Sequence, residues 1–208
     1  MKKNGILTLV LFFAFFSAEA QVVKVGLKGG INTSNIISNI DNTQLTLGFQ
    51  AGGMISFDFI PKVTIQPEIL YSLQGTGFDT DSDDFTYRWD LHYLQVPVLA
   101  KIYLTDNLNI QVGPSFNFLL GASSAGNLDS GFDFLDDLIG DFTTGDINDS
   151  FSNADIAAIL GIGYDINKFT IALRYNLSLT NINDIENDDE KWRNQVINLS
   201  LGYYFLNL

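Results

Sequence analysis

The sequence contains no cysteine, and this absence excludes several kinds of structure. The chain forms no disulfide, holds no metal through thiolates and carries no lipid-modified N-terminal cysteine, so its fold must close without such cross-links. Histidine occurs once, and only 11 basic residues stand against 24 acidic ones. Because nucleic acid attracts basic surfaces, we expect no nucleic-acid partner for so acidic a chain.

Long apolar runs are also missing, except at the N-terminus. Lys2 and Lys3 precede an apolar run over residues 6–16, and Ala18-Glu19-Ala20 follows it. A run this short, ending in a small-x-small pattern, predicts a secretory signal peptide over residues 1–20 and export of the chain. No later stretch is apolar for the roughly 20 residues that a spanning helix needs, so residues 21–208 are predicted to form a single domain of the sandwich or barrel kind.

The sequence does have a regular alternation of apolar and polar residues. In residues 169–180, FTIALRYNLSLT, the apolar side chains begin at Phe169 and recur at every second position. This period is typical of a β-strand with one face in an apolar medium and the other in a polar one. The same pattern recurs in seven further segments, which are residues 23–32, 47–59, 63–73, 93–104, 108–118, 155–165 and 197–205.

The connections between these segments alternate in length. Tight turns are expected at Ile60-Pro61, at residues 105–107 and at Ile166-Asn167, whereas the other connections are long and polar. Short turns at one end, long loops at the other and an even number of strands are typical of outer-membrane barrels. The pattern therefore predicts an all-β fold, an eight-stranded antiparallel up-and-down transmembrane β-barrel with both termini in the periplasm.

The alternation alone does not say which face is outside. A soluble lipocalin-like calyx also has eight up-and-down strands, but its apolar face points inward. Here the polar positions are mostly Gly, Ser, Thr, Asn and Gln, which fit a narrow lumen better than a solvated surface. Aromatic residues also gather near the strand ends, as interfacial girdles do. We therefore expect the apolar face to contact lipid, and Arg174 and Asn176 to point into the barrel.

Several segments together resemble a known family. They are VGLKGGIN (25–32), YLQVPVLAKIYL (93–104), NIQVGPSFNFLL (109–120), IAAILGIGYDI (156–166) and FTIALRYNLSLTNI (169–182), and YLQVPVLAK is the most distinctive of them. The chain is similar in these segments to the PorT-like outer membrane β-barrel family, also described as porin family or outer membrane protein beta-barrel domain. The resemblance covers nearly the whole exported chain. It implies residence in the outer membrane of a Gram-negative cell, insertion by the barrel assembly machinery, and a role in secretion or envelope assembly.

Charged residues are predicted at inward positions of the strands. Four are basic and four acidic: Lys24, Lys28, Lys101 and Arg174, with Asp58, Glu68, Asp155 and Asp165. Counting along the strands places Lys28, Glu68 and Arg174 near the middle of the barrel. Buried charges must be paired, so these residues are predicted to fill the lumen as an ion network. The alternative is a narrow or gated ion path.

The remaining acidic residues concentrate in the long connections. Those connections contain 17 of the 23 acidic residues left after removal of the signal peptide. Solubility explains such loops, and divalent cation binding or contact with lipopolysaccharide is the alternative. A weak calcium candidate has acids at Asp79, Asp81, Asp83 and Asp90, but Asp84 occupies the position where an EF-hand loop needs glycine. Residues 134–142 have helical spacing and predict a short helix or a packed loop.

The functional predictions follow from this arrangement. His92 is the only histidine and is expected on the outer face near the loops, where it has no partners for nucleophilic catalysis, so we expect no enzyme and no cofactor. The expected function is that of a structural or interaction scaffold with acidic extracellular loops. A narrow channel for ions or small solutes is the alternative. The expected partners are outer-membrane lipid, lipopolysaccharide and envelope or secretion proteins.

Overall fold

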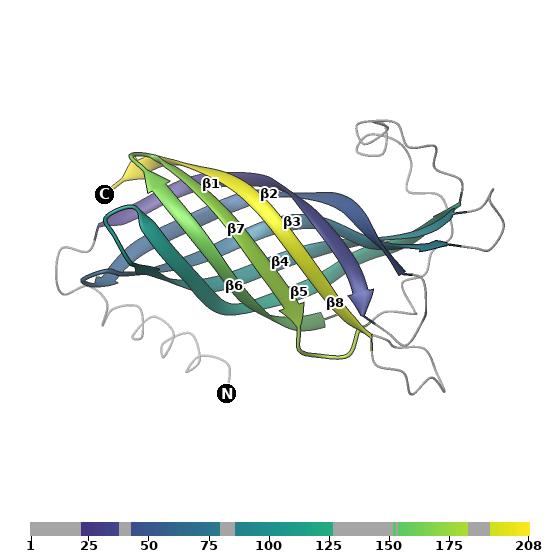
Figure 1. Cartoon of the computed structure of the whole chain (residues 1–208). Coiled ribbons are helices and arrows are strands. Elements are labelled where there is room, and N and C mark those ends of the chain that lie inside the picture. The colour runs from purple at the N-terminus through teal and green to yellow at the C-terminus, as the bar shows by residue number, and fades with distance from the viewer. Residues whose placement is uncertain (1–21, 38–42, 80–85, 127–151, 153, 183–191) are drawn as a thin grey trace, which may run out of the picture.

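The computed structural model describes residues 22–37, 43–79, 86–126, 152, 154–182 and 192–208, which form eight β-strands. The strands are β1 (Val23–Ile37), β2 (Thr43–Ile60), β3 (Val63–Asp79), β4 (Thr86–Tyr103), β5 (Leu108–Gly126), β6 (Ala154–Ile166), β7 (Phe169–Ser178) and β8 (Arg193–Asn207). Each strand pairs antiparallel with the next, and β8 pairs with β1, so the sheet closes on itself (Figure 1). The predicted eight-stranded up-and-down barrel is confirmed.

Tight turns and the closing strands meet at one end of the barrel, the short-turn end. Two turn residues, Lys62 and Asn167, have positive φ angles of 67° and 53°. Asparagine adopts this left-handed region more readily than most residues, which suits a turn of two residues between β6 and β7. Val23 and Leu208 exchange backbone hydrogen bonds of 3.1 and 2.8 Å at the same end. The first and last strands are thus joined there.

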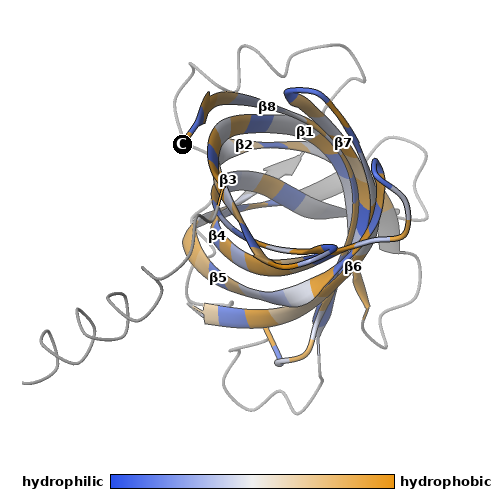
Figure 2. Ribbon diagram, turned by 90° about the vertical axis from the view of Figure 1, so that its left-hand side faces the viewer, coloured by the Kyte–Doolittle hydropathy of each residue, from blue (hydrophilic) through white to orange (hydrophobic). Residues whose placement is uncertain are grey.

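The two faces of the sheet differ as the alternation predicted. In β7 the outward side chains of Phe169, Ile171 and Leu173 are 44–53% exposed, whereas Thr170 and Arg174 point inward and are buried. Figure 2 shows apolar and polar residues alternating along the strands around the barrel. A soluble calyx would have the opposite arrangement, so the apolar outer surface excludes that alternative. No helix among the described residues is long and apolar enough to cross a membrane.

Inward-facing glycines allow neighbouring strands to lie close together. A β-carbon at Gly52 of β2 would collide with the backbone of Ile69 and Leu70 in β3. At Gly161 of β6 it would lie 2.7 Å from the Cγ atom of Arg174. Glycine at such positions leaves space in a lumen that eight strands make only just wide enough for side chains.

The strands extend beyond the predicted segments at the opposite end, the long-loop end. β4 begins at Thr86 rather than near residue 93, and β5 continues to Gly126, although β5 pairs with β6 only as far as Phe118 and Ala154. Beyond that point the described part of β5 pairs with β4 alone, and β3, β4 and β5 project past the other strands (Figure 1). Residues 86–92, TYRWDLH, alternate in the opposite phase to residues 94–104, because their apolar side chains stand at odd-numbered positions, so this extension does not continue the predicted pattern.

Candidate functional site

The lumen is the part of the barrel where polar and charged side chains converge, and its central layer is built on Glu68. Glu68 in β3 is 1% exposed and contacts two cations. Arg174 of β7 donates to both of its carboxylate oxygens at 2.8 Å, and Lys28 of β1 donates to the same two oxygens at 3.2 and 3.3 Å. The structure thus brings together the three residues that the sequence placed near mid-barrel.

Neutral amides complete this central layer. Gln66 Nε2 donates to Glu68 at 2.6 Å, and the Arg174 Nε atom donates to Gln111 Oε1 at 2.7 Å. One carboxylate is therefore shared by two cations, and all three side chains are buried inside the barrel. Buried charges of this kind depend on their partners, because an unpaired charge in such a place is strongly destabilising.

A second ion pair lies toward the short-turn end. The Nζ atom of Lys101 in β4 is 2.6 Å from Asp165 Oδ2 in β6, and Tyr103 donates its hydroxyl proton to the same oxygen at 2.5 Å. The Lys101 Nζ atom also lies 5.6 Å from the centre of the Tyr103 ring. Lys101 is fully buried, so this pair fills the lumen between the central layer and the short-turn end.

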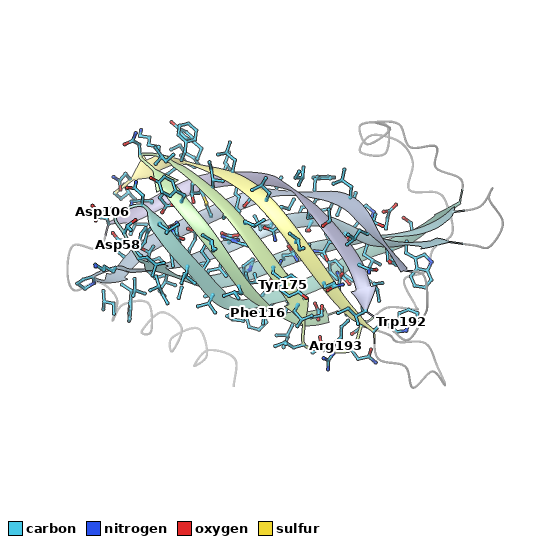
Figure 3. All side chains as sticks on the ribbon, viewed as in Figure 1. Asp58, Asp106, Phe116, Tyr175, Trp192 and Arg193 are labelled. Atoms are coloured by element: carbon cyan, nitrogen blue, oxygen red, sulfur yellow. The ribbon has the colours of Figure 1, made fainter. Side chains whose placement is uncertain are left out.

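Near the short-turn end Lys24 is half-buried and Asp58 is exposed, and no ion pair joins either of them to the other charges of the described strands. Asp58 accepts a hydrogen bond of 2.6 Å from the Thr64 hydroxyl. Figure 3 shows Asp58 at this end of the barrel. The eight charged residues predicted to form one network are therefore divided, and these two belong to neither the Glu68 cluster nor the Lys101–Asp165 pair.

Asp155 lies on the other side of the central layer and is likewise held by neutral groups. Its carboxylate is 4% exposed and accepts hydrogen bonds from Asn117 and Ser178 at 2.8 Å and from Thr180 at 2.6 Å. Thr180 also accepts a bond of 3.0 Å from the backbone amide of Ile156. Asp155 thereby fastens the start of β6 to the residues that follow β7.

An apolar cluster closes the lumen at the long-loop end, and the sequence analysis missed it. We call it the apolar cap, and its members are Ile36, Leu91, Tyr93, Ala122, Ile182 and Trp192, with Trp89 and Leu119 packed against them. Ile182 and Trp192 come from the connection between β7 and β8, and Figure 3 shows Trp192 at this end. Trp89 and Trp192 pack with ring centres 5.5 Å apart. They are the two tryptophans of the chain, and their presence in predicted connections was the signal available in the sequence.

Backbone hydrogen bonds hold the two cap residues of this connection. The Ile182 amide donates to the Trp192 carbonyl at 3.0 Å, and Asn181 Oδ1 accepts from the Trp192 amide at 2.8 Å. The amide of Ser152, before β6, donates to the Ile182 carbonyl at 2.9 Å. The cap is therefore joined to the bases of the β5–β6 and β7–β8 connections.

The remaining predictions concern His92 and the calcium candidates. His92 is on the outer face of β4, where its Nδ1 atom is 2.5 Å from the Tyr71 hydroxyl. Of the calcium candidates, Asp79 ends β3 and Asp90 is buried in β4, while Asp81 and Asp83 fall outside the described residues, as does the predicted helix at 134–142. Strands flank this segment, whereas helices flank an EF-hand loop. Among the described residues no three His, Cys, Asp or Glu side chains group as metal ligands.

Comparison with known proteins gives the same architecture. A family model described as outer membrane protein beta-barrel domain matches residues 19–184, which is well over half of the chain. Neisserial surface protein A has a solved structure with a TM-score of 0.51 and 11% identity over 87% of this chain and 97% of its own. Ail of Yersinia pestis, solved with the heparin analogue sucrose octasulfate, has a TM-score of 0.44 and 15% identity over 88% and 99% of the two chains. No curated protein sequence matches.

Proposed function

The chain belongs to the outer membrane protein beta-barrel domain family, and from this premise we propose that it is a non-conducting scaffold in the outer membrane. In this proposal the barrel anchors and spaces the long acidic connections at the outer surface of the cell. The short-turn end, with Val23 and Leu208, faces the periplasm.

The observation that supports this proposal is the burial of the charged residues inside the barrel. Glu68 and Lys101 are at most 1% exposed, and Arg174 is 3% exposed. Side chains that line an aqueous pore contact water and keep a substantial exposed area. In an eight-stranded barrel the side chains themselves fill the interior. The charged layers and the apolar cap therefore favour a plugged lumen over a continuous ion path.

The acidic connections are where a scaffold of this kind would make its contacts. Residues 127–151 contain seven aspartates, and residues 183–191 contain five acidic residues. The described bases of these two connections meet at the bond between Ser152 and Ile182. Lipopolysaccharide through bridging divalent cations, or an envelope or secretion protein as the PorT-like resemblance suggests, are the partners that this proposal predicts.

Single-channel recording on refolded protein tests the proposal. We expect the folded barrel, identified by a gel mobility that shifts on boiling, to give no steady current in a planar bilayer. Replacing residues 128–150 with a short turn is expected to leave this folded mobility unchanged and to abolish capture of lipopolysaccharide or of an envelope protein. Steady current steps whose size changes in Glu68→Ala would instead establish a channel and refute the scaffold.

A further inference from the structure

A small polar chamber lies inside the barrel on the long-loop side of the central charged layer. Six polar side chains line it: Gln74, Gln95, Asn117, Asn176, Ser178 and Asn194. All of them are buried, and they come from strands β3, β4, β5, β7 and β8. The chamber therefore belongs to the interior of the sheet and not to the surface.

The strand pattern places the chamber directly beneath the apolar cap. Residues two apart in a strand point to the same face. In β4 the cap residue Tyr93 is two residues from Gln95 of the chamber, and at the start of β8 Trp192 is two residues from Asn194. In β7 the chamber residue Asn176 is two residues from Arg174. The chamber thus separates the cap from the charged layer.

The chamber contains a buried polar atom without a protein partner. Asn194 is 5% exposed, and its Nδ2 atom donates to Gln74 Oε1. Its Oδ1 atom is fully buried and accepts no hydrogen bond from the protein. Buried amide oxygens in native proteins are satisfied by protein donors or by ordered water, and water occupies cavities with several polar partners.

We propose that this chamber is an internal hydration site and that the apolar cap seals it from the long-loop end. Water is the ligand, and it donates to Asn194 Oδ1 and bonds to the surrounding amides. On the other side the ion pairs of Glu68 separate the chamber from the short-turn end. This inference concerns only the lumen and is independent of what the acidic connections bind.

Magnetisation transfer from water tests the hydration of the chamber in the full barrel in lipid nanodiscs. We expect nuclear Overhauser cross-peaks between water and the side-chain amide protons of Asn194. Gln111 is the matched control, because Arg174 donates to its Oε1 atom and its own Nε2 atom donates to Asn109 at 2.9 Å. Absence of the Asn194 cross-peaks, or equal cross-peaks at Gln111, would overturn the hydration site.

Single cysteines test the seal, because the chain contains none of its own. Ser178→Cys places a thiol in the chamber. Ser56→Cys places one beside the Gln66 side chain, on the opposite side of the charged layer. The two serines are 2% and 3% exposed, so they form a matched pair. Modification by 2-aminoethyl methanethiosulfonate is followed by mass spectrometry in nanodiscs.

With the cap intact we expect slow modification at both positions. Trp192→Ala, or Ile182→Ala if the first variant does not fold, is expected to accelerate modification of Ser178→Cys at least tenfold and to leave Ser56→Cys unchanged. An unchanged rate at Ser178→Cys in a barrel that keeps its folded gel mobility would overturn the seal. Equal acceleration at both positions would also overturn it, because it would show that the whole barrel had loosened.

Discussion

At the scale of single residues, the interior depends most on Glu68. Among the residues that the structure describes, it is the one carboxylate within hydrogen-bonding distance of both Lys28 and Arg174, and all three side chains are at most 4% exposed. The two cations are not equivalent, because Arg174 makes a bidentate pair with Glu68 while the bonds from Lys28 are longer. Planar bidentate pairs of this kind are the stronger type.

This asymmetry predicts different effects of two substitutions. Glu68→Ala leaves two buried cations without a carboxylate, and we expect the free energy of unfolding to fall by about 3–5 kcal/mol. Lys28→Met removes one cation and keeps the pair between Arg174 and Glu68, so we expect a much smaller fall in the free energy of unfolding. Urea unfolding in lipid vesicles, followed by tryptophan fluorescence, measures both. Equal losses would contradict a special role for the carboxylate.

At the scale of the strands, β1 and β2 show how tightly the sheet must close. Inward Gly52 pairs with Lys28, whereas the next residue, Gly53, faces outward and pairs with Leu27. A β-carbon at Gly52 would collide with the backbone of β3, while one at Gly53 would have its nearest neighbour 4.0 Å away. Adjacent glycines in the same strand therefore have different constraints.

We accordingly expect Gly52→Val to prevent barrel closure and Gly53→Val to permit it. Valine is favourable in strands, so the substitution itself does not disfavour the strand conformation. The fraction of refolded protein with folded gel mobility before boiling measures the difference. Equal folding of the two variants would show that β2 and β3 can separate to accept the side chain.

At the scale of the whole molecule, the barrel has its apolar side chains outside and its polar side chains inside, which is the reverse of a soluble protein. Its outward surface carries large apolar side chains such as Leu160, which is 61% exposed, and its inward surface carries polar ones. Aromatic side chains on the outward surface contact one another. The ring centres of Phe169 and Tyr203 are 5.1 Å apart, and those of Phe49 and Tyr71 are 5.7 Å apart. Such an outer surface is stable only in an apolar medium.

The depth of a charge in the bilayer should therefore determine its effect. Leu160→Arg, in the middle of β6, is expected to lower the free energy of unfolding by about 2–4 kcal/mol. Leu206→Arg, at the short-turn end of β8, should lower it by about 0–1 kcal/mol, because the guanidinium there reaches the interface. Reversible urea unfolding in vesicles checks this. A larger loss at Leu206 would contradict the placement of the membrane.

Part of the interior could be predicted from the sequence and part could not. Alternation puts Glu68 and Arg174 on the inward face, because parity within a strand is a local property. It does not show that Arg174 pairs with Glu68 while Asp155 is held by hydroxyl and amide groups, since those contacts cross the lumen between strands distant in sequence. The calcium hypothesis for Asp79, Asp81, Asp83 and Asp90 stays a prediction.

The sequence by itself determined the barrel, because a period of two and alternating connection lengths are written into consecutive residues. The tertiary structure alone decided how the lumen is filled. Ile36, Leu91 and Trp192 come from three separate segments without a shared local pattern, and only closure of the sheet brings them together as the cap. Which inward side chains meet depends on strand register and barrel diameter, and both are properties of the closed sheet.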